Sequence, residues 1–416
     1  MYPEHSPQPD PTLAHRRAAA TITLRRPDGE PLSDAVVTVE QTRHEFGFGC
    51  IGFDFLPLHH GEADPEEAQR LTALADLWLD VFNWATLPFY WGRFEPERGK
   101  PHTDELRATA EWLAGHGVTL KGHPLVWHTV GAKWLLDLTT DEIEQVQRER
   151  IRRDVADFAG LIDMWDAINE VVIMPVFTAE ANGITRLARK LGRVGTIRLA
   201  FEEARATNPS ATLLLNDFDM SSAYDTLIEA VLEAGIQVDA IGLQSHMHQG
   251  WWGPEKTERI LEKFSRYGLP LHFTEMTLVS GDLMPKHIVD LNDHVVDSWP
   301  TTPDGEARQA EELEAHLRML WEHPSVESAT YWGISDVGAW LGAPAGLVRL
   351  DGTPKPAYDA LHRLVKEEWW TAPTTLRTDA DGRLTVEGWK GSHRVTAAGL
   401  TAEFDLAVAP EELTLR

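Results

Sequence analysis

Two glutamates, Glu170 and Glu275, stand at the ends of separate apolar, strand-like runs of the sequence. A single glutamate in such a place is more often a structural carboxylate in a salt bridge. A pair on opposite walls of one site can cleave a glycosidic bond, because one carboxylic acid protonates the leaving oxygen while the other carboxylate acts at the anomeric carbon. A separation of about 5 Å would give retention of configuration and a wider gap inversion, and the residues alone leave this choice open.

Other strand-like runs also end in polar or aromatic side chains. Asn169 directly precedes Glu170, and the remaining candidates are His123, Trp127, Gln244, His246 and Trp332. His123, His246 and His248 together with carboxylates also raise the possibility of a zinc site. No His-Glu-x-x-His or Cys-x-x-Cys spacing accompanies them. We therefore expect neither a metal nor an organic cofactor, since two carboxylates suffice for glycoside cleavage.

Short apolar runs alternate with longer segments of helical periodicity from about residue 44 to residue 336, a pattern typical of parallel strands joined by crossover helices. The eight strand-like runs are His44–Cys50, Trp78–Thr86, Thr119–His128, Ile162–Glu170, Thr212–Asp219, Ala240–His248, Pro270–Met276 and Ala329–Asp336. Eight such units predict an α/β fold, the (β/α)8 TIM barrel. Its reactive groups sit at the C-terminal ends of the strands, where the candidates stand.

Four segments follow from the composition along the chain. Residues 1–18 are expected to be a flexible tail, 19–43 an N-terminal β segment, 44–369 the catalytic barrel and 370–416 a C-terminal β appendage. In the N-terminal segment, Thr21–Leu24 and Ala35–Glu40 flank a turn and predict a hairpin-like pair. We expect these small β-rich additions to be structural, packing outside the barrel or against each other, rather than a carbohydrate-binding module.

The 416 residues carry a formal net charge of −27, which disfavours nucleic acid or an anionic membrane as a partner. No run reaches the roughly 18 apolar residues of a membrane span. The first ten residues are polar and proline-rich and lack the pattern of a signal peptide, so we expect a cytoplasmic protein, or a secreted one if a signal has been removed. The lone cysteine, Cys50, is expected to be buried. The oligomeric state is not readable.

Four ordered motifs give the sequence a resemblance to glycoside hydrolase family 10, which consists chiefly of endo-β-1,4-xylanases. They are Trp165-Asp-Ala-Ile-Asn-Glu170, Gly242-Leu-Gln-Ser-His246, Phe273-Thr-Glu275 and Trp332-Gly-Ile-Ser-Asp336. The resemblance covers roughly residues 44 to 365. It implies retaining double displacement, with Glu170 as acid/base and Glu275 as nucleophile.

The same resemblance implies roles for the surrounding side chains. Asn169 matches the residue that bonds the sugar 2-hydroxyl. The rest of the subsite for the attacked sugar is matched by His123, Trp127, Gln244, His246, Trp332 and Trp340. Phe218, in Asn216-Asp-Phe218, stands where the family has a tyrosine on the leaving-group side.

The sequence departs from the family on the side of the next glycone sugar. A Glu-Asn pair that grips this sugar is replaced by Thr86-Leu87, and a lysine that bonds a sugar hydroxyl by Tyr90. Val130 replaces a glutamine, and Thr277 replaces the acidic residue that supports the active-site histidine. Loss of such hydrogen bonds predicts an altered distal glycone subsite.

We therefore expect a retaining β-glycoside hydrolase that acts on β-1,4-xylan-derived oligosaccharides. The alternatives are a specialised β-glycosidase releasing a mono- or disaccharide from short or aryl glycosides, and a non-catalytic carbohydrate-binding barrel. Transglycosylation shares the covalent intermediate with hydrolysis and cannot be separated from it by sequence.

Overall fold

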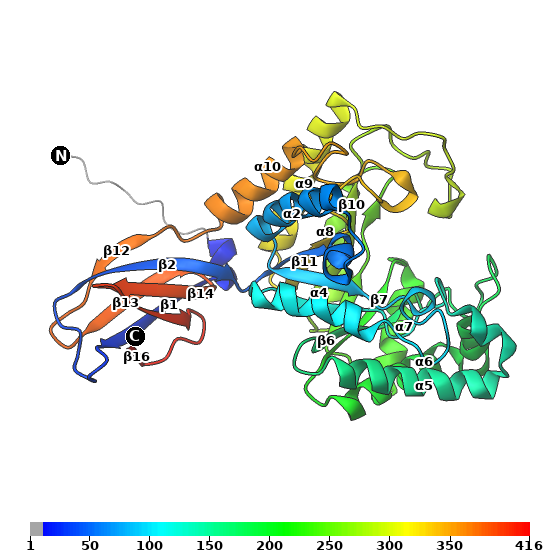
Figure 1. Cartoon of the computed structure of the whole chain (residues 1–416), viewed down its shortest axis with the longest axis horizontal. Helices are drawn as coiled ribbons and strands as arrows, with labels where there is room; N and C mark the ends of the chain where they lie inside the picture. The colour runs from blue at the N-terminus through cyan, green and yellow to red at the C-terminus, as the bar shows by residue number, and fades with distance from the viewer. Residues whose placement is uncertain (1–10) are drawn as a thin grey trace.

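The computed structural model describes residues 11–416, which form two lobes. The larger lobe is a barrel of parallel strands surrounded by helices, and the smaller is an all-β lobe at the left of Figure 1. Of the predicted tail, residues 1–10 lie outside the described part of the chain.

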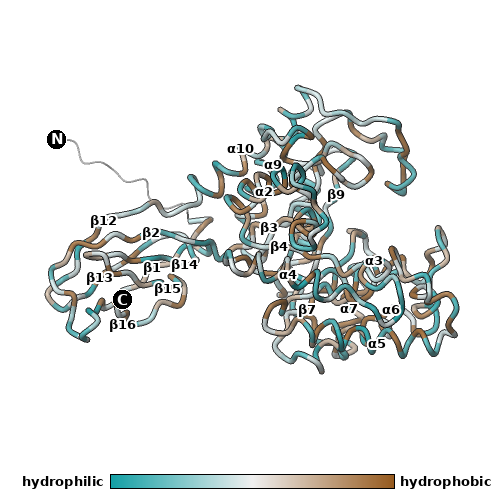
Figure 2. The backbone as a smooth tube through the Cα atoms, viewed as in Figure 1, coloured by the Kyte–Doolittle hydropathy of each residue, from teal (hydrophilic) through white to brown (hydrophobic). Residues whose placement is uncertain are grey.

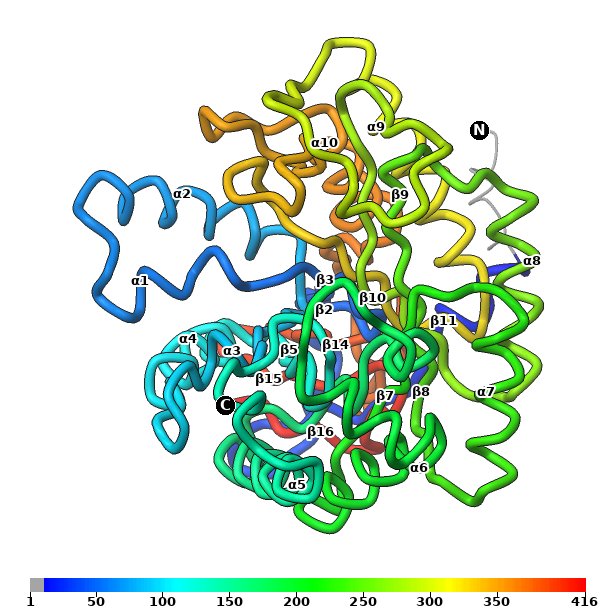
Figure 3. Tube along the Cα trace, turned by 90° about the vertical axis from the view of Figure 1, so that its right-hand side faces the viewer, coloured from blue at the N-terminus to red at the C-terminus, as the bar shows by residue number. Residues whose placement is uncertain are grey.

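Eight parallel strands close the barrel in the order β3-β4-β5-β6-β7-β8-β10-β11, with β11 pairing back to β3. The predicted (β/α)8 fold is thus confirmed. Turned by 90°, these strands lie near the centre, with the helices around them (Figure 3). Their bounds are β3 (Gly47–Ile51), β4 (Trp84–Pro88), β5 (Thr119–His123), β6 (Met164–Asn169), β7 (Thr212–Asp217), β8 (Ala240–Leu243), β10 (Leu271–Leu278) and β11 (Val326–Tyr331). A short extra strand, β9 (His246–Met247), pairs with the end of β10.

Helices connect successive strands and cover the outside of the barrel. Their bounds are α1 (Leu56–His60), α2 (Pro65–Val81), α3 (Trp91–Phe94), α4 (Thr103–Gly115), α5 (Thr140–Asp157), α6 (Gly183–Thr207), α7 (Ser222–Glu233), α8 (Gly253–Ser265), α9 (Pro303–Glu322) and α10 (Pro356–Arg363), which continues as a π-helix, η6 (Leu364–Glu368). The 3-10 turns of the barrel are η2 (Phe53–Phe55), η3 (Lys133–Asp137), η4 (Leu291–Asp293) and η5 (Trp340–Gly342).

The helix starts follow from local chemistry. Thr139 and Glu142 form a capping box at the start of α5, and the Asp64 carboxylate accepts the first backbone N–H groups of α2. Hydrophobic residues alternate with hydrophilic ones along the tube of α5 and α9 (Figure 2). The apolar residues of each helix face the strands, as the helical period of the sequence predicts.

The predicted strand at Trp78–Thr86 is wrong in its first half. Trp78 and Val81 are buried in the last turns of α2, and β4 begins only at Trp84. A short apolar run has the same appearance in a fully buried helix end as in a buried strand, so periodicity does not separate them. The first predicted run is also displaced, because His44 ends a strand of the other lobe.

The β lobe consists of the residues before β3 and after η6. Its strands are β1 (Arg17–Arg25), β2 (Val36–His44), β12 (Thr374–Arg377), β13 (Arg383–Trp389), β14 (Gly391–Ala397), β15 (Leu400–Asp405) and β16 (Glu412–Thr414). They form two sheets, β13-β1-β16 and β12-β2-β14-β15. A shared core lies between them and includes Ile22, Leu24, Val37, Val39, Leu384, Val386, Val395 and Phe404. The terminal segments therefore pack against each other.

Two predictions for the N-terminal segment are corrected. β1 and β2 are not a hairpin, because each pairs with C-terminal strands in a different sheet. Part of the predicted tail is structured as well: residues 11–16 form a 3-10 helix, η1 (Pro11–Arg16), and β1 starts at Arg17. The Arg16 guanidinium donates to the backbone oxygens of Trp321, His323 and Val326 at 2.9, 3.0 and 2.6 Å, which ties this segment to the barrel.

Cys50 is fully buried in β3, as predicted, and burial raises the pKa of its thiol. Among residues 11–416, none of the helices has both the length and the apolar character to cross a membrane. The same part of the chain holds no group of three His, Cys, Asp or Glu side chains placed to bind a metal ion.

Candidate active site

Glu170 and Glu275 both lie at the C-terminal mouth of the barrel. Glu170 directly follows β6, and Glu275 lies within β10. Their side chains are 15% and 5% exposed, so both are largely removed from water yet open to a ligand at the mouth. Three side-chain amides connect them.

An amide relay, made of Asn169, Gln244 and Asn216, joins the two glutamates. Gln244 donates to Glu170 Oε1 at 3.2 Å and to Asn169 Oδ1 at 2.9 Å. Asn216 donates to the same Asn169 oxygen at 2.8 Å and to Glu275 Oε1 at 3.0 Å. All three amides are buried. Because buried amides must satisfy their hydrogen bonds, the relay fixes the two carboxylates relative to each other.

The environment of Glu170 favours its protonated form. Burial raises the pKa of the Glu170 carboxyl to about 8, and the neighbouring carboxylates Glu275 and Asp217 contribute to this rise. Hydrogen bonds from Trp127 and Gln244 act in the opposite direction and lower the pKa. The Trp127 indole N–H donates to Glu170 Oε2 at 2.8 Å. A carboxylic acid that keeps its proton near neutral pH is suited to general acid catalysis.

Histidines hold the other glutamate. His246 Nε2 lies 3.1 Å from Glu275 Oε2, and His123 Nε2 lies 4.0 Å from Glu275 Oε1. The Thr277 hydroxyl is 3.5 Å from His246 Nδ1, at the limit of a hydrogen bond, and accepts from the Met247 backbone N–H at 3.1 Å. Thr277 therefore gives His246 weaker support than a carboxylate would.

His123 is oriented from behind by a buried ion pair. Its Nδ1 lies 2.7 Å from Asp166 Oδ2, and Lys121 Nζ lies 2.8 Å from the same oxygen. Burial alone would raise the pKa of Asp166, but Lys121 and His123 outweigh it and lower this pKa. With the Nδ1–H group donating to the Asp166 carboxylate, Nε2 is the ring atom left to form a hydrogen bond with a ligand. Nε2 is buried and has no partner in the structure.

Aromatic rings form one wall of the mouth. Tyr90 lies 5.3 Å from Trp127 and 5.7 Å from His123, measured between ring centroids. Phe53 lies 5.7 Å from both Tyr90 and Trp332. Burial and the nearby Glu275 raise the pKa of the Tyr90 phenol well above its usual value, so it remains a hydrogen-bond donor.

Thr86 and Leu87 stand where the family has the Glu-Asn pair that grips the next glycone sugar. Thr86 and Leu87 belong to β4 and are 2% and 0% exposed. Leu87 has no polar side-chain atom to offer a ligand, and the rings of Phe53 and Tyr90 lie near these two residues at the mouth. A sugar in this region meets aromatic faces and one phenol.

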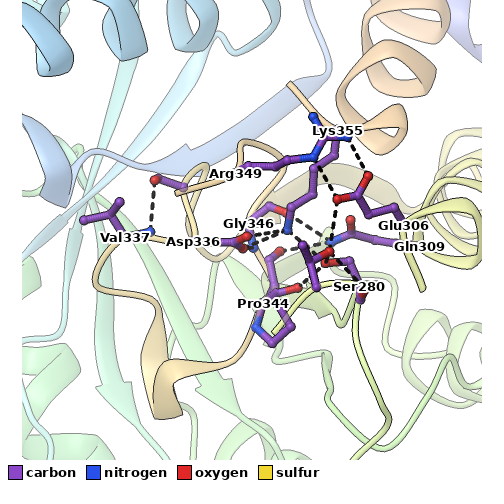
Figure 4. A network of polar contacts seen from close by, with 12 residues as sticks. Ser280, Glu306, Gln309, Asp336, Val337, Pro344, Gly346, Arg349 and Lys355 are labelled. Carbon is purple, nitrogen blue, oxygen red and sulfur yellow. Dashed lines mark hydrogen bonds and ion pairs between the residues drawn. The ribbon is translucent and has the colours of Figure 1, made fainter. Parts of the chain in front are cut away.

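The loop after β11 carries Trp332 and Trp340. Trp340 lies 4.9 Å from His246 and 5.2 Å from His248, measured between ring centroids. A buried ion pair anchors this loop, because Lys355 Nζ lies 2.8 Å from Asp336 and 2.9 Å from Ser280 Oγ (Figure 4). We refer to these three residues as the loop anchor.

The loop anchor has further partners on both sides of the loop. Asp336 accepts the Gly346 backbone N–H at 2.9 Å, and the Ser280 hydroxyl donates to Pro344 O at 2.7 Å. The anchor thus joins the loop after β11 to Ser280, just past the end of β10 (Figure 4).

The structure brings together all but one of the predicted site residues. Glu170, Glu275, Asn169, His123, Trp127, Gln244, His246, Trp332, Trp340 and Tyr90 share the contacts above. Phe218 follows β7 at the rim and is 46% exposed. Four further residues belong to the site although the sequence alone predicted no role for them: Asn216, Lys121, Asp166 and Phe53. Lys121 and Asp166 carried a usable signal, because charged residues inside apolar strands require buried partners.

In a comparison with known protein families, residues 87–364 match the family model described as Glycosyl hydrolase family 10. A protein of Acetivibrio thermocellus named anti-sigma-I factor RsgI6 is 25% identical, over 92% of this chain and 45% of its own length. Endo-1,4-beta-xylanase B of Thermotoga neapolitana is 24% identical, over 67% of this chain and 78% of its own length. The chain thus spans under half of the first relative.

A solved structure of xylanase 10B from Thermotoga petrophila in complex with xylobiose shares the fold. It superposes with a TM-score of 0.63 at 22% sequence identity, over 78% of this chain and 95% of that structure. The structure of a family 10 enzyme from Paenibacillus barcinonensis gives a TM-score of 0.62 over 76% of this chain.

Proposed function

Because this chain belongs to glycosyl hydrolase family 10, we propose that it is a retaining β-glycoside hydrolase that cleaves β-1,4-xylan-derived oligosaccharides by double displacement. Glu170 is the acid/base and Glu275 the nucleophile. The observation that carries the proposal is the amide relay, which links a carboxyl whose pKa is raised to about 8 to a second carboxylate held by His246.

The first step forms a covalent glycosyl ester. A Glu275 oxygen attacks the anomeric carbon while the bond to the leaving oxygen breaks and that oxygen takes the proton of Glu170. Asn169 and Asn216 hold the geometry of this step through their shared hydrogen bond. The free Nε2 of His123 accepts a hydrogen bond from a hydroxyl of the sugar at the reacting position.

The second step releases the sugar with its original configuration. Glu170, now a carboxylate, takes a proton from water as the water oxygen attacks the anomeric carbon, and Glu275 departs as a carboxylate. The water inserts its oxygen and both glutamates return to their starting states. The hydrogen bond from Trp127 keeps Glu170 aimed at the same place in both steps.

The proposed substrate class, xylan-derived oligosaccharides, is supported by the names of the relatives and by the aromatic walls of the mouth. Two of the relatives above are xylanases by name, and one solved structure contains xylobiose. The rings of Tyr90, Trp127 and Trp332 offer flat faces for neutral sugar rings. A net charge of −27 fits a neutral substrate better than an anionic one.

The test is initial-rate hydrolysis of xylohexaose, xylobiose, and aryl β-xyloside, β-glucoside and β-disaccharide substrates. We expect cleavage of β-xylosidic bonds, and proton NMR at early times should show the β-anomer as first product. Accumulation of the α-anomer would contradict the retaining assignment. Activity confined to aryl glycosides would favour the specialised β-glycosidase, and binding without turnover the non-catalytic barrel.

Two variants assign the roles. Glu170→Ala should slow substrates with poor leaving groups far more than dinitrophenyl glycosides, because a good leaving group departs without a proton. Glu275→Ala should slow both alike. If both variants lost the same fraction of the hydrolysis rate on both kinds of leaving group, the assignment of Glu170 as acid/base would be wrong. A cytoplasmic location stays a prediction, which cell fractionation tests.

A further inference from the structure

The backbone at Glu170 is held in an unusual conformation. Its φ is +56°, in the left-handed region that residues with a side chain rarely adopt. Such a conformation is strained and persists only where the surroundings impose it. One restraint is visible at once, because the Glu170 N–H donates to the backbone oxygen of Asn216 at 2.9 Å.

Asp217 supplies the restraint on the other side. This carboxylate ends β7 and is completely buried. Its Oδ2 accepts the backbone N–H of Val172 at 3.0 Å, two residues after Glu170, and its Oδ1 accepts that of Asp219 at 3.0 Å. The turn that begins at Glu170 is therefore tied to β7 by a side chain.

Asp217 is also linked to Glu170 through the amide relay. Its backbone oxygen accepts the N–H of Gln244 at 3.0 Å, and the Gln244 side chain donates to Glu170. Asp217 thus connects the loops after β6, β7 and β8, which all border the acid/base carboxyl.

The charge of Asp217 is stabilised differently from that of Asp166. Asp166 faces Lys121 and His123, whereas Asp217 is bonded to two backbone N–H groups. The titratable groups facing Asp217 are Asp219, Tyr224 and Glu170. Glu170 faces Glu275, Asp217, the Tyr90 phenol and His128, whose Nε2 is 3.9 Å away. Negative charge on Asp217 therefore disfavours negative charge on Glu170.

We propose that Asp217 is a positioning residue for the acid/base: its buried carboxylate clamps the turn at Glu170 and, by repulsion, keeps the Glu170 proton in place until the leaving group takes it. This inference rests on the proposed role of Glu170. Burial raises the pKa of the Asp217 carboxyl as well, and the backbone N–H groups of Val172 and Asp219 act against this rise by stabilising its charged form.

The first test uses Asp217→Asn, with Asp219→Asn as the matched control that removes one charge two residues away. For a substrate with a poor leaving group, kcat/KM should fall on the alkaline side at a pH lower by about half a unit or more in Asp217→Asn. The control should keep the wild-type profile. Coinciding profiles for wild type and Asp217→Asn would overturn the proposal.

The second test separates positioning from general damage. Asp217→Ala also removes the clamp, so it should slow poor leaving groups at least tenfold more than dinitrophenyl glycosides, which do not need the proton of Glu170. Equal slowing of both substrates would mean a structural role only and would overturn the proposal.

A third measurement needs no substitution at Asp217. In Glu275→Gln protein with carbon-13 in its glutamate carboxyl groups, the Glu170 signal should titrate in two steps, because Asp217 ionises beside it. A single step would overturn the coupling. This readout does not depend on turnover, so absence of activity on every glycoside would contradict the proposed function and leave the coupling to be judged by NMR.

Discussion

The two ends of the barrel use aromatic side chains in opposite ways. At the N-terminal end of the strands, beside the β lobe, Phe48, Trp321 and Trp369 stack with ring planes within 24° of each other. At the mouth, Tyr90, Trp127 and Trp332 meet the neighbouring rings edge-on or tilted, and the Trp127 indole donates to the Glu170 carboxyl. Parallel stacking closes one end, and tilted rings with polar neighbours leave the other able to receive a ligand.

The comparison predicts that changes at the mouth affect turnover and changes at the closed end affect stability. The largest effect should come from Glu275→Gln, which removes the nucleophile and keeps the hydrogen bond from Asn216. We expect kcat to fall by about 10⁴-fold or more, with little change in thermal unfolding. Calorimetry and rates on the same preparation check this. A large fall in the unfolding temperature would contradict the prediction that changes at the mouth affect turnover and not stability.

Lys355→Met should give the next largest effect, because it leaves Asp336 buried without its cation. The loss of unfolding free energy should be about 3–5 kcal/mol. KM should rise as the loop with Trp332 and Trp340 loosens. The control is the double variant Lys355→Met/Asp336→Leu, which leaves no uncompensated charge and should recover much of the stability. Failure to recover would assign the loss to packing of the lysine stem.

Arg16→Met should have a smaller effect, confined to the closed end. The methionine keeps apolar contact with Phe46 and Trp321 but removes three hydrogen bonds to backbone oxygens. A loss of about 1–3 kcal/mol in unfolding free energy is expected, with kcat/KM unchanged at 25 °C. Arg17→Met, at a residue that covers only the Trp389 ring, is the control and should cost less. A changed kcat/KM would show that the two ends are coupled.

The smallest effect should be a pH dependence set by Glu170. Its pKa in the folded protein is about 8 against a usual 4.5, so kcat/KM should be halved near pH 8 and fall further above it. The raised pKa also favours the folded state at low pH, and this contribution is lost as pH rises from 4.5 through 8. Glu170→Gln should remove that part of the pH dependence of stability, as measured by urea unfolding at several pH values.

The sequence predicted the barrel and the placement of Glu170 and Glu275 at strand ends, because nearly every strand-like run ended in a polar group that an apolar strand does not need. The strand limits were less predictable: Trp78 and Val81 form an apolar run that suits a helix end as well as a strand. Asn216 bonds both Asn169 and Glu275, and no local pattern reveals a contact between residues 47 and 59 positions apart.

The β lobe was least predictable, since β1 and β2 pair with strands more than 300 residues away in the sequence. β1 aligns Ala20 with Val386, and β2 aligns Val39 with Val395. Each segment on its own shows only alternation of polar and apolar residues, which predicts a strand but not its partner. The nearest strand-like neighbour therefore suggested a hairpin that does not form.

The shared β lobe also sets the order of events during synthesis of the chain. Residues 17–44 leave the ribosome before the whole barrel, and their partners at residues 374–414 leave it only after the barrel. At about 5–20 residues per second, the wait is roughly 16–66 s. For that time the apolar faces of β1 and β2 have no sheet to join, and the nascent chain must shield them while the barrel folds. Chaperone contact at this stage is where we expect production of the protein to be most sensitive.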